Sequence, residues 1–167
     1  MKLVEGVAHV ADLEAFLADL DAVADEYGCT VQAFDARYLV GREHLRRAVE
    51  LADRAFEREE NVARDRGVEI LLYAAGRRQI DQSLELGVAE GDGPVVVLVD
   101  DPDDRASAED AAADAVAALL EPADTLGAYD EERVCAFFDV DPAEREAVAG
   151  DLSDLVLERV ALLDVEK

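Results

Sequence analysis

Few residues in this sequence have a type and spacing suited to catalysis or metal binding. Cys29 and Cys135 are the only cysteines, lie far apart and form no CxxC pair. A structural zinc site takes four Cys or His ligands, so both are interpreted as free core thiols. Neither His9 nor His44 has a spacing typical of Ser-His-Asp or Cys-His catalysis. We therefore expect no metal, no cofactor and no enzymatic activity.

An acidic run after an apolar stretch is the one alternative to that expectation. Asp100, Asp101, Asp103 and Asp104 follow the segment VVVLV, where a strand is expected to end. The run lacks the glycine and the distal glutamate of a calcium loop, so a solvated turn is favoured. The glycine-rich residues 87–94 precede the strand, whereas a phosphate loop follows one. A small divalent-dependent hydrolase or nucleotide-binding enzyme that uses Asp100–Asp104 is kept as the alternative.

Basic residues are concentrated in one stretch of a strongly acidic chain. The chain has a formal net charge of −25, yet residues 37–78 contain ten arginines against eight acidic residues. A locally basic stretch is the natural candidate for contact with an anion. An ordinary ion-paired helix surface would give the same composition.

Arg77 and Arg78 are expected at the start of a helix, where positive charge is unfavourable. Two guanidinium groups beside free helix N–H groups would make a phosphate site. In the alternative, Arg78 or Gln79 turns inward to hold a buried carboxylate such as Glu69.

Apolar periodicity and turn residues predict the elements that must position these groups. We expect an edge strand over 2–8, then a helix capped by Asp12 and ended by Gly28. A second strand over 29–34 continues loosely to residue 40. A long helix begins at Gly41, a short one covers VEILLYAA, and RRQIDQSLEL forms another that ends at Gly87. An alanine-rich helix covers about 106–120, and further helices begin near Asp130, Asp141 and Asp151.

These elements indicate an α+β fold in a single domain over residues 1–167. We expect a small mixed sheet of about 3–5 strands, with a central apolar strand at about 94–100, flanked by about seven helices. No apolar stretch approaches the roughly 20 residues that cross a bilayer. No basic-then-apolar leader is visible, so we expect a cytoplasmic protein without membrane contact.

The charge also indicates the solvent to which the protein is adapted. Acidic residues number 41, and the basic ones are 14 arginines and two lysines. In molar salt the Debye length falls to about 3 Å, so the repulsion between the many acidic side chains is screened. We interpret the composition as halophilic. A nucleic-acid mimic would concentrate its acid on one face, whereas here it is spread along the chain.

Several segments together resemble one known family. EILLYAAGRRQIDQSLELG (69–87) is similar to the signature of the small kinase-binding subunit of the KEOPS complex, the PRPK-binding protein family. VGREHLRRAVELA (40–52) resembles the family's helix entry, and GPVVVLVDD (93–101) its central strand. VLERVALLDVEK (156–167) resembles its last helix. The chain looks like a haloarchaeal-type member.

The resemblance implies a non-catalytic subunit of the complex that makes threonylcarbamoyladenosine in tRNA. Its expected partners are the atypical kinase/ATPase subunit, the tRNA 3′ CCA end and, indirectly, the threonylcarbamoyl-transferase subunit. Single-stranded ends are recognised by stacking and by phosphate contacts. The residues expected to bind RNA are Arg42, His44, Arg77, Arg78 and Gln79. An acidic interaction module without RNA binding is a further alternative.

The last predicted helix is expected to bind the kinase. Its apolar residues span an arc wider than the stripe of about 100° that one core needs. We expect the partner contact at Leu155, Val156, Arg159 and Val160. Burial of these apolar residues within the protein's own fold is the favoured explanation of the wide apolar arc.

Overall fold

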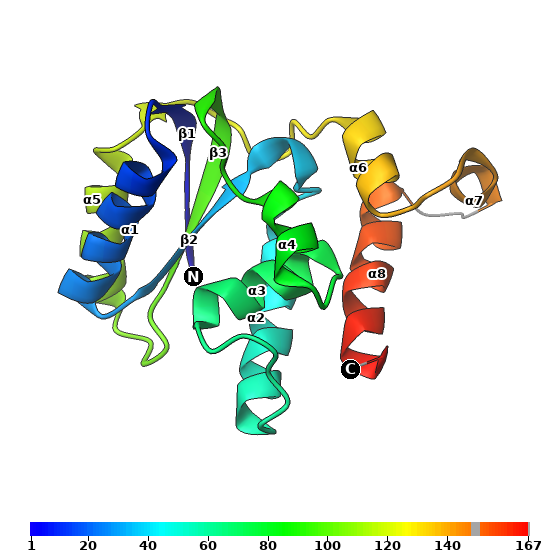
Figure 1. Cartoon of the computed structure of the whole chain (residues 1–167), viewed down its shortest axis with the longest axis horizontal. Coiled ribbons are helices and arrows are strands. Elements are labelled where there is room, and N and C mark those ends of the chain that lie inside the picture. Colours follow the sequence, from blue (N-terminus) through cyan, green and yellow to red (C-terminus); the bar gives the residue numbers. More distant parts are fainter. Residues whose placement is uncertain (148–150, 167) are drawn as a thin grey trace. The chain divides into compact units, whose positions relative to one another are not determined.

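The structure is a computed structural model that describes residues 1–147 and 151–166, and these form two compact units (Figure 1). Unit 1 consists of Met1–Ala36 and Gly87–Leu126. Unit 2 consists of Arg37–Leu86 and the described residues of 127–167. Each unit is therefore built from two separate stretches of chain.

Unit 1 contains a four-stranded sheet in the order β2-β3-β1-β4. The strands are β1 (Lys2–Val10), β2 (Thr30–Asp35), β3 (Gly91–Asp100) and β4 (Glu121–Pro122). β3 pairs antiparallel with both β1 and β2, and β4 pairs antiparallel with β1. The α+β class and the apolar inner strand are confirmed. The sheet is antiparallel throughout rather than mixed, because β3 lies between the two strands that run in the same direction.

Two expectations about the first strands need correction. β1 is not an edge strand along its whole length, because β4 pairs with its outer side at Gly6 and Val7, while no strand pairs there with Lys2–Glu5 among the described residues. β2 ends at Asp35, opposite Val95, and a 3-10 helix (Ala36–Tyr38) follows instead of further strand. The next residue of β3 is Pro94, which has no N–H group to extend the ladder.

Helices α1 (Leu13–Tyr27) and α5 (Ala106–Ala117) lie side by side against one face of this sheet (Figure 1). As expected, Asp12 caps α1 by accepting from the N–H of Ala15, and Gly28 ends it at φ 66°. The core of unit 1 joins alternate β3 residues to both helices. It includes Val95, Val97, Val99, Leu20, Val23 and Val116.

Unit 2 is helical. Its longer helices are α2 (Arg42–Glu57), α3 (Arg66–Ala75) and α8 (Leu152–Glu166), which pack against one another. α4 (Ile80–Ser83), a 3-10 helix (Leu84–Leu86), α6 (Glu131–Phe137) and α7 (Pro142–Ala147) complete the unit. The predicted starts near Asp130, Asp141 and Asp151 are confirmed. Lys167, the last residue of the segment compared with the family's final helix, lies outside the described residues.

The helix expected over RRQIDQSLEL is much shorter than predicted. Gly76 ends α3 in the left-handed region at φ 63°, and α4 begins only at Ile80. Arg77 and Arg78 therefore precede the helix and do not lie in its first turn. Glycine is favoured at this position because φ is 63°, a backbone conformation that residues with a Cβ rarely adopt.

Among the described residues, none of the helices combines the length and apolarity that crossing a membrane would take.

Candidate functional site

His44 connects the first turn of α2 to the last turn of α3. The backbone N–H of Val40 donates to Nδ1 of His44 at 3.3 Å, which makes Nδ1 the acceptor. Nε2 must then carry the proton, and it donates to the carbonyl oxygen of Ala74 at 2.7 Å. Both ring nitrogens are thus used within unit 2.

The same ring is fully buried and uncharged. His44 has no exposed surface, and burial lowers its pKa to about 4. The hydrogen bond to Ala74 opposes that shift but does not outweigh it. A neutral ring with no exposed surface does not offer a contact to RNA. His44 instead holds neighbouring segments in place. Its sequence context, a histidine among arginines, did not indicate this structural role.

His44 brings two parts of the basic stretch to one end of unit 2. Arg42 lies two residues before His44, in the same first turn. Arg78 and Gln79 follow Ala74 by four and five residues, just after Gly76. Arg42, Arg78 and Gln79 are all exposed. We call this end, defined by those three residues, the basic end of unit 2.

Arg77 has a different environment from its neighbour. Its guanidinium group donates to the carbonyl oxygen of Phe137 and lies 5.0 Å from the centre of the Phe137 ring. Asp139 lies 3.7 Å away. Tyr38 and Phe138 pack edge-on against the same Phe137 ring. Arg77 thus holds the segment after α6 in place.

The alternative in which Arg78 or Gln79 turns inward concerns the carboxylate of Glu69. Arg78 and Gln79 are exposed, while the carboxylate of Glu69 is buried. Glu69 accepts from the backbone N–H groups of Val62 and Ala63 at 3.1 and 3.0 Å. This carboxylate therefore fixes the loop between α2 and α3.

Several arginines of α2, and the first residue of α3, are ion-paired within unit 2. Arg46 binds Glu43 and Glu50, and Arg47 also binds Glu50. Arg66 binds Asp53 at 2.8 Å. For these three residues the ion-paired helix surface is the correct interpretation of the composition. The hypothesis that the basic stretch binds an anion is therefore restricted to the basic end of unit 2, Arg42, Arg78 and Gln79.

The apolar residues of α8 are used by unit 2 itself. Leu155, Val156 and Val160 are buried to within 3 % exposure, on a helix that contacts α2 and α3. Tyr73 of α3 donates to Asp164 of α8 at 3.2 Å; burial, and then this carboxylate, raises the pKa of Tyr73. Burial within the fold, the favoured alternative, therefore accounts for these apolar side chains.

Arg159 ties α8 to the chain before it. It donates to the carbonyl oxygen of Phe138 at 3.1 Å and to both carboxylate oxygens of Glu144 at 2.7 and 2.8 Å. The exposed side of α8 is formed by Asp154, Glu158 and Leu162, which follow one another at four-residue spacing. Leu162 is 41 % exposed.

The first two residues of the acidic run at the end of β3, Asp100 and Asp101, are ion-paired within unit 1. Asp101 accepts from the backbone N–H groups of Asp103 and Arg105, and its carboxylate pairs with the Arg105 guanidinium at 2.7 Å. That guanidinium is the main reason why the pKa of Asp101 is lowered. Asp100 pairs with the amino group of Met1 at 3.1 Å. Within residues 1–147 and 151–166, no group of three His, Cys, Asp or Glu side chains is arranged to hold a metal ion.

An exposed apolar pair on α4 and the 3-10 helix after it was missed by sequence reasoning. Ile80, which directly follows Gln79, is 44 % exposed, and Leu84 is 58 % exposed. Their four-residue spacing was visible, but it is equally typical of a core stripe, which a longer helix would have buried.

The geometry thus defines an α+β protein whose conspicuous polar side chains hold its own loops and helix ends. Comparison with protein-family models then identifies the family. The family model described as kinase binding protein CGI-121 matches residues 6–164, and the chain belongs to this family of kinase-binding proteins. The resemblance stated from the sequence is confirmed. No curated protein matches the chain significantly.

Proposed function

We propose that this protein is the non-catalytic kinase-binding subunit of a KEOPS complex. In this role it binds the atypical kinase/ATPase subunit and recruits tRNA through the 3′ CCA end. It reaches the threonylcarbamoyl-transferase subunit indirectly, in the cytoplasm. The match to the kinase-binding family over residues 6–164 carries the proposal.

The exposed side of α8 is the proposed kinase contact. Leu155, Val156 and Val160 support it from inside, because they fix the helix on unit 2. Leu162 is its large exposed apolar residue, and Leu157 and Ala161 of the same helix are half-buried. Arg159 contributes by holding the chain around Phe138 and Glu144. An exposed leucine on a helix that also has half-buried apolar residues suits packing on a second protein.

The kinase contact is tested by a matched pair of substitutions. Leu162 and Leu17 are 41 % and 42 % exposed and lie on helices of different units. We expect Leu162→Asp to weaken binding of the co-purified kinase subunit at least tenfold in calorimetry, and Leu17→Asp to leave it unchanged. Equal affinities for the two variants would show that α8 is not the contact.

The basic end of unit 2 is the proposed contact for the tRNA end. Arg42 and Arg78 are exposed, and each also makes an intramolecular interaction with which a phosphate must compete. Guanidinium groups suit this task in concentrated salt, because bidentate and stacked contacts depend less on counterion release than point charges do. Gln79 adds an amide to the same end. Arg77 supports the site through Phe137, and His44 through Ala74.

Binding of tRNA with and without its CCA end tests this second contact. Arg42→Ala with Arg78→Ala is expected to lower affinity for intact tRNA about tenfold, and to remove the preference for the CCA end. Arg46→Ala is the control, because Arg46 is an exposed α2 arginine paired with Glu43 and Glu50. If the control loses as much affinity as the double variant, only general charge is involved. Kinase binding should be unaffected in both the double variant and the Arg46→Ala control.

A further inference from the structure

The outer edge of β1 is open over its first residues. β1 pairs with β3 along its whole length, Lys2–Val10, but with β4 only at Gly6 and Val7. Among the described residues, no strand pairs with the outer side of Lys2–Glu5. In an antiparallel strand, successive residues direct their N–H and C=O groups to opposite sides. Half of the backbone groups in this segment therefore face away from β3.

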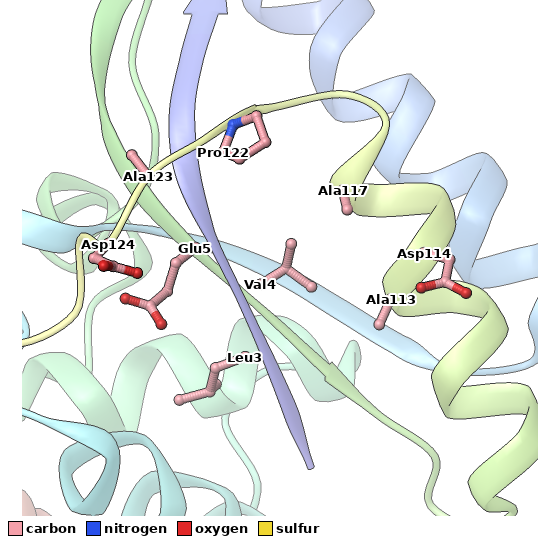
Figure 2. A pocket seen from close by; sticks show the side chains of 9 residues that line it. All are labelled: Leu3, Val4, Glu5, Ala113, Asp114, Ala117, Pro122, Ala123 and Asp124. Carbon is pink, nitrogen blue, oxygen red and sulfur yellow. The ribbon is translucent and has the colours of Figure 1, made fainter.

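A groove runs along this open edge (Figure 2). It has a volume of about 610 Å³ and is lined by Leu3, Val4 and Glu5 of β1, by residues of α5 and by Pro122–Asp124. Its α5 wall presents the small side chains of Ala113 and Ala117. Because these side chains are small, the groove has room for the backbone of another chain beside the open edge of β1.

The groove carries three carboxylates and no basic side chain. They belong to Glu5, Asp114 and Asp124. Figure 2 shows Glu5 and Asp124 together on one side of β1, whereas Asp114 lies beyond β1 on α5. Opposite faces of an added strand would each meet negative charge.

The edge is held in place from both ends. The amino group of Met1 pairs with Asp100 and Glu109 at 3.1 and 3.0 Å. At the other end, Oε1 of Glu5 accepts from the backbone N–H groups of Thr125 and Leu126 at 3.0 and 2.7 Å. A binding partner therefore meets an edge that is already ordered, which lowers the entropic cost of binding.

We propose that this edge binds an extended, arginine- or lysine-bearing segment of a partner protein by strand addition. The added segment hydrogen-bonds to the outward groups of Lys2–Glu5, as in other peptide complexes of this kind. Because side chains of a strand alternate, two adjacent basic residues reach the two sides of the groove, one toward Asp114 and the next toward Glu5 and Asp124. A second copy of this chain is disfavoured as occupant, since each copy carries a net charge of −25. The site lies in unit 1 and is independent of the proposed kinase and tRNA contacts.

A designed peptide tests the proposal on the full chain. The probe is a ten-residue peptide of Thr and Val with two adjacent central arginines. One control peptide has glutamates in place of the arginines, and a second has proline beside them, which removes an N–H donor. The readouts are affinity and backbone amide shifts, measured by NMR in constant high salt.

Two lysine variants provide the matched comparison. Ala117 lines the groove, while its neighbour Ala118 does not, and both are exposed. We expect the arginine peptide to shift and protect the amides of residues 2–5. Ala117→Lys, the glutamate peptide and the proline peptide should each lower affinity at least tenfold, while Ala118→Lys should change it less than twofold.

Three results would overturn the proposal. Shifts located away from residues 2–5 would place the peptide elsewhere. Equal binding of the proline peptide would show attraction by charge without strand addition. A free protein that sediments as a dimer, and as a monomer after Ala117→Lys, would identify a second copy as the occupant.

Discussion

Acidification is expected to destabilise this protein through His44, whose ring is buried and neutral. Burial lowers its pKa from the ordinary 6.5 to about 4. Between these values the unfolded chain binds a proton that the folded one does not, so stability falls as pH falls. The loss is about 2 kcal/mol at pH 5 and about 3 kcal/mol at pH 4, relative to pH 7.5.

The assay is urea unfolding at fixed high salt between pH 4 and pH 7.5, on the wild type and on His44→Gln. Glutamine does not titrate, so the difference in unfolding free energy between the two proteins isolates residue 44. His9 titrates in the opposite sense: bonds to Glu121 and then Asp92 raise its pKa, so its contribution is present below pH 6.5 and is lost as pH rises through the raised value. His9 is present in both proteins and cancels in the difference.

A wild-type advantage over His44→Gln that does not change from pH 7.5 to pH 4.5 would refute this reasoning. An independent check is the ring itself. Nitrogen NMR should show the Nε2–H tautomer, with Nδ1 unprotonated, down to about pH 5, because Nε2 donates to Ala74 and Nδ1 accepts from Val40. Protonation of Nδ1 at pH 6 would mean that the ring is not buried in solution.

Three further substitutions test the contacts that shape the two units. Gly76→Ala should lower the unfolding free energy by about 1–2 kcal/mol in urea titrations, because φ is 63°, where a residue with a Cβ is strained; an unchanged midpoint would contradict this. Glu69→Gln should cost about 1–3 kcal/mol and speed hydrogen exchange at the two amides it binds, whereas the exposed Glu60→Gln should do neither. Gly6→Ala places a Cβ 2.7 Å from a β4 carbonyl, so we expect about 1–3 kcal/mol of destabilisation and faster amide exchange in β4; retained protection there would show that β4 tolerates the methyl group.

The elements of the fold were largely predictable because their signals are local. Capping aspartates mark helix starts, and Gly28 and Gly76, which have left-handed backbone conformations, mark helix ends. The apolar run at 95–99 marks a strand. The pairing of the strands in the sheet was less predictable. Whether 2–10 is an edge or an inner strand depends on Glu121 and Pro122, more than a hundred residues later, and two residues give no strand pattern.

The site was predicted less well than the fold, because residue type does not report burial. His44 stands among arginines in sequence, yet the helical turn directs it to the carbonyl of Ala74. Arg77 and Arg78 are neighbours in sequence, but only Arg77 is drawn to the carbonyl and ring of Phe137. The two arginines differ because Arg77 contacts Phe137, which lies 60 positions later in the sequence. A local sequence pattern does not encode such a tertiary contact.

The position of β3 in the sheet has a consequence for the order in which the chain folds. β1 and β2 both pair with β3 and not with each other, and Lys2 meets Val99. Nearly a hundred residues must therefore leave the ribosome before either early strand finds its partner. Until then the two strands are unpaired edges joined by a helix, and closure of so long a loop carries a large entropic cost. We expect slow formation of the sheet, and an interval during synthesis in which the nascent chain depends on its acidic surface to stay unaggregated.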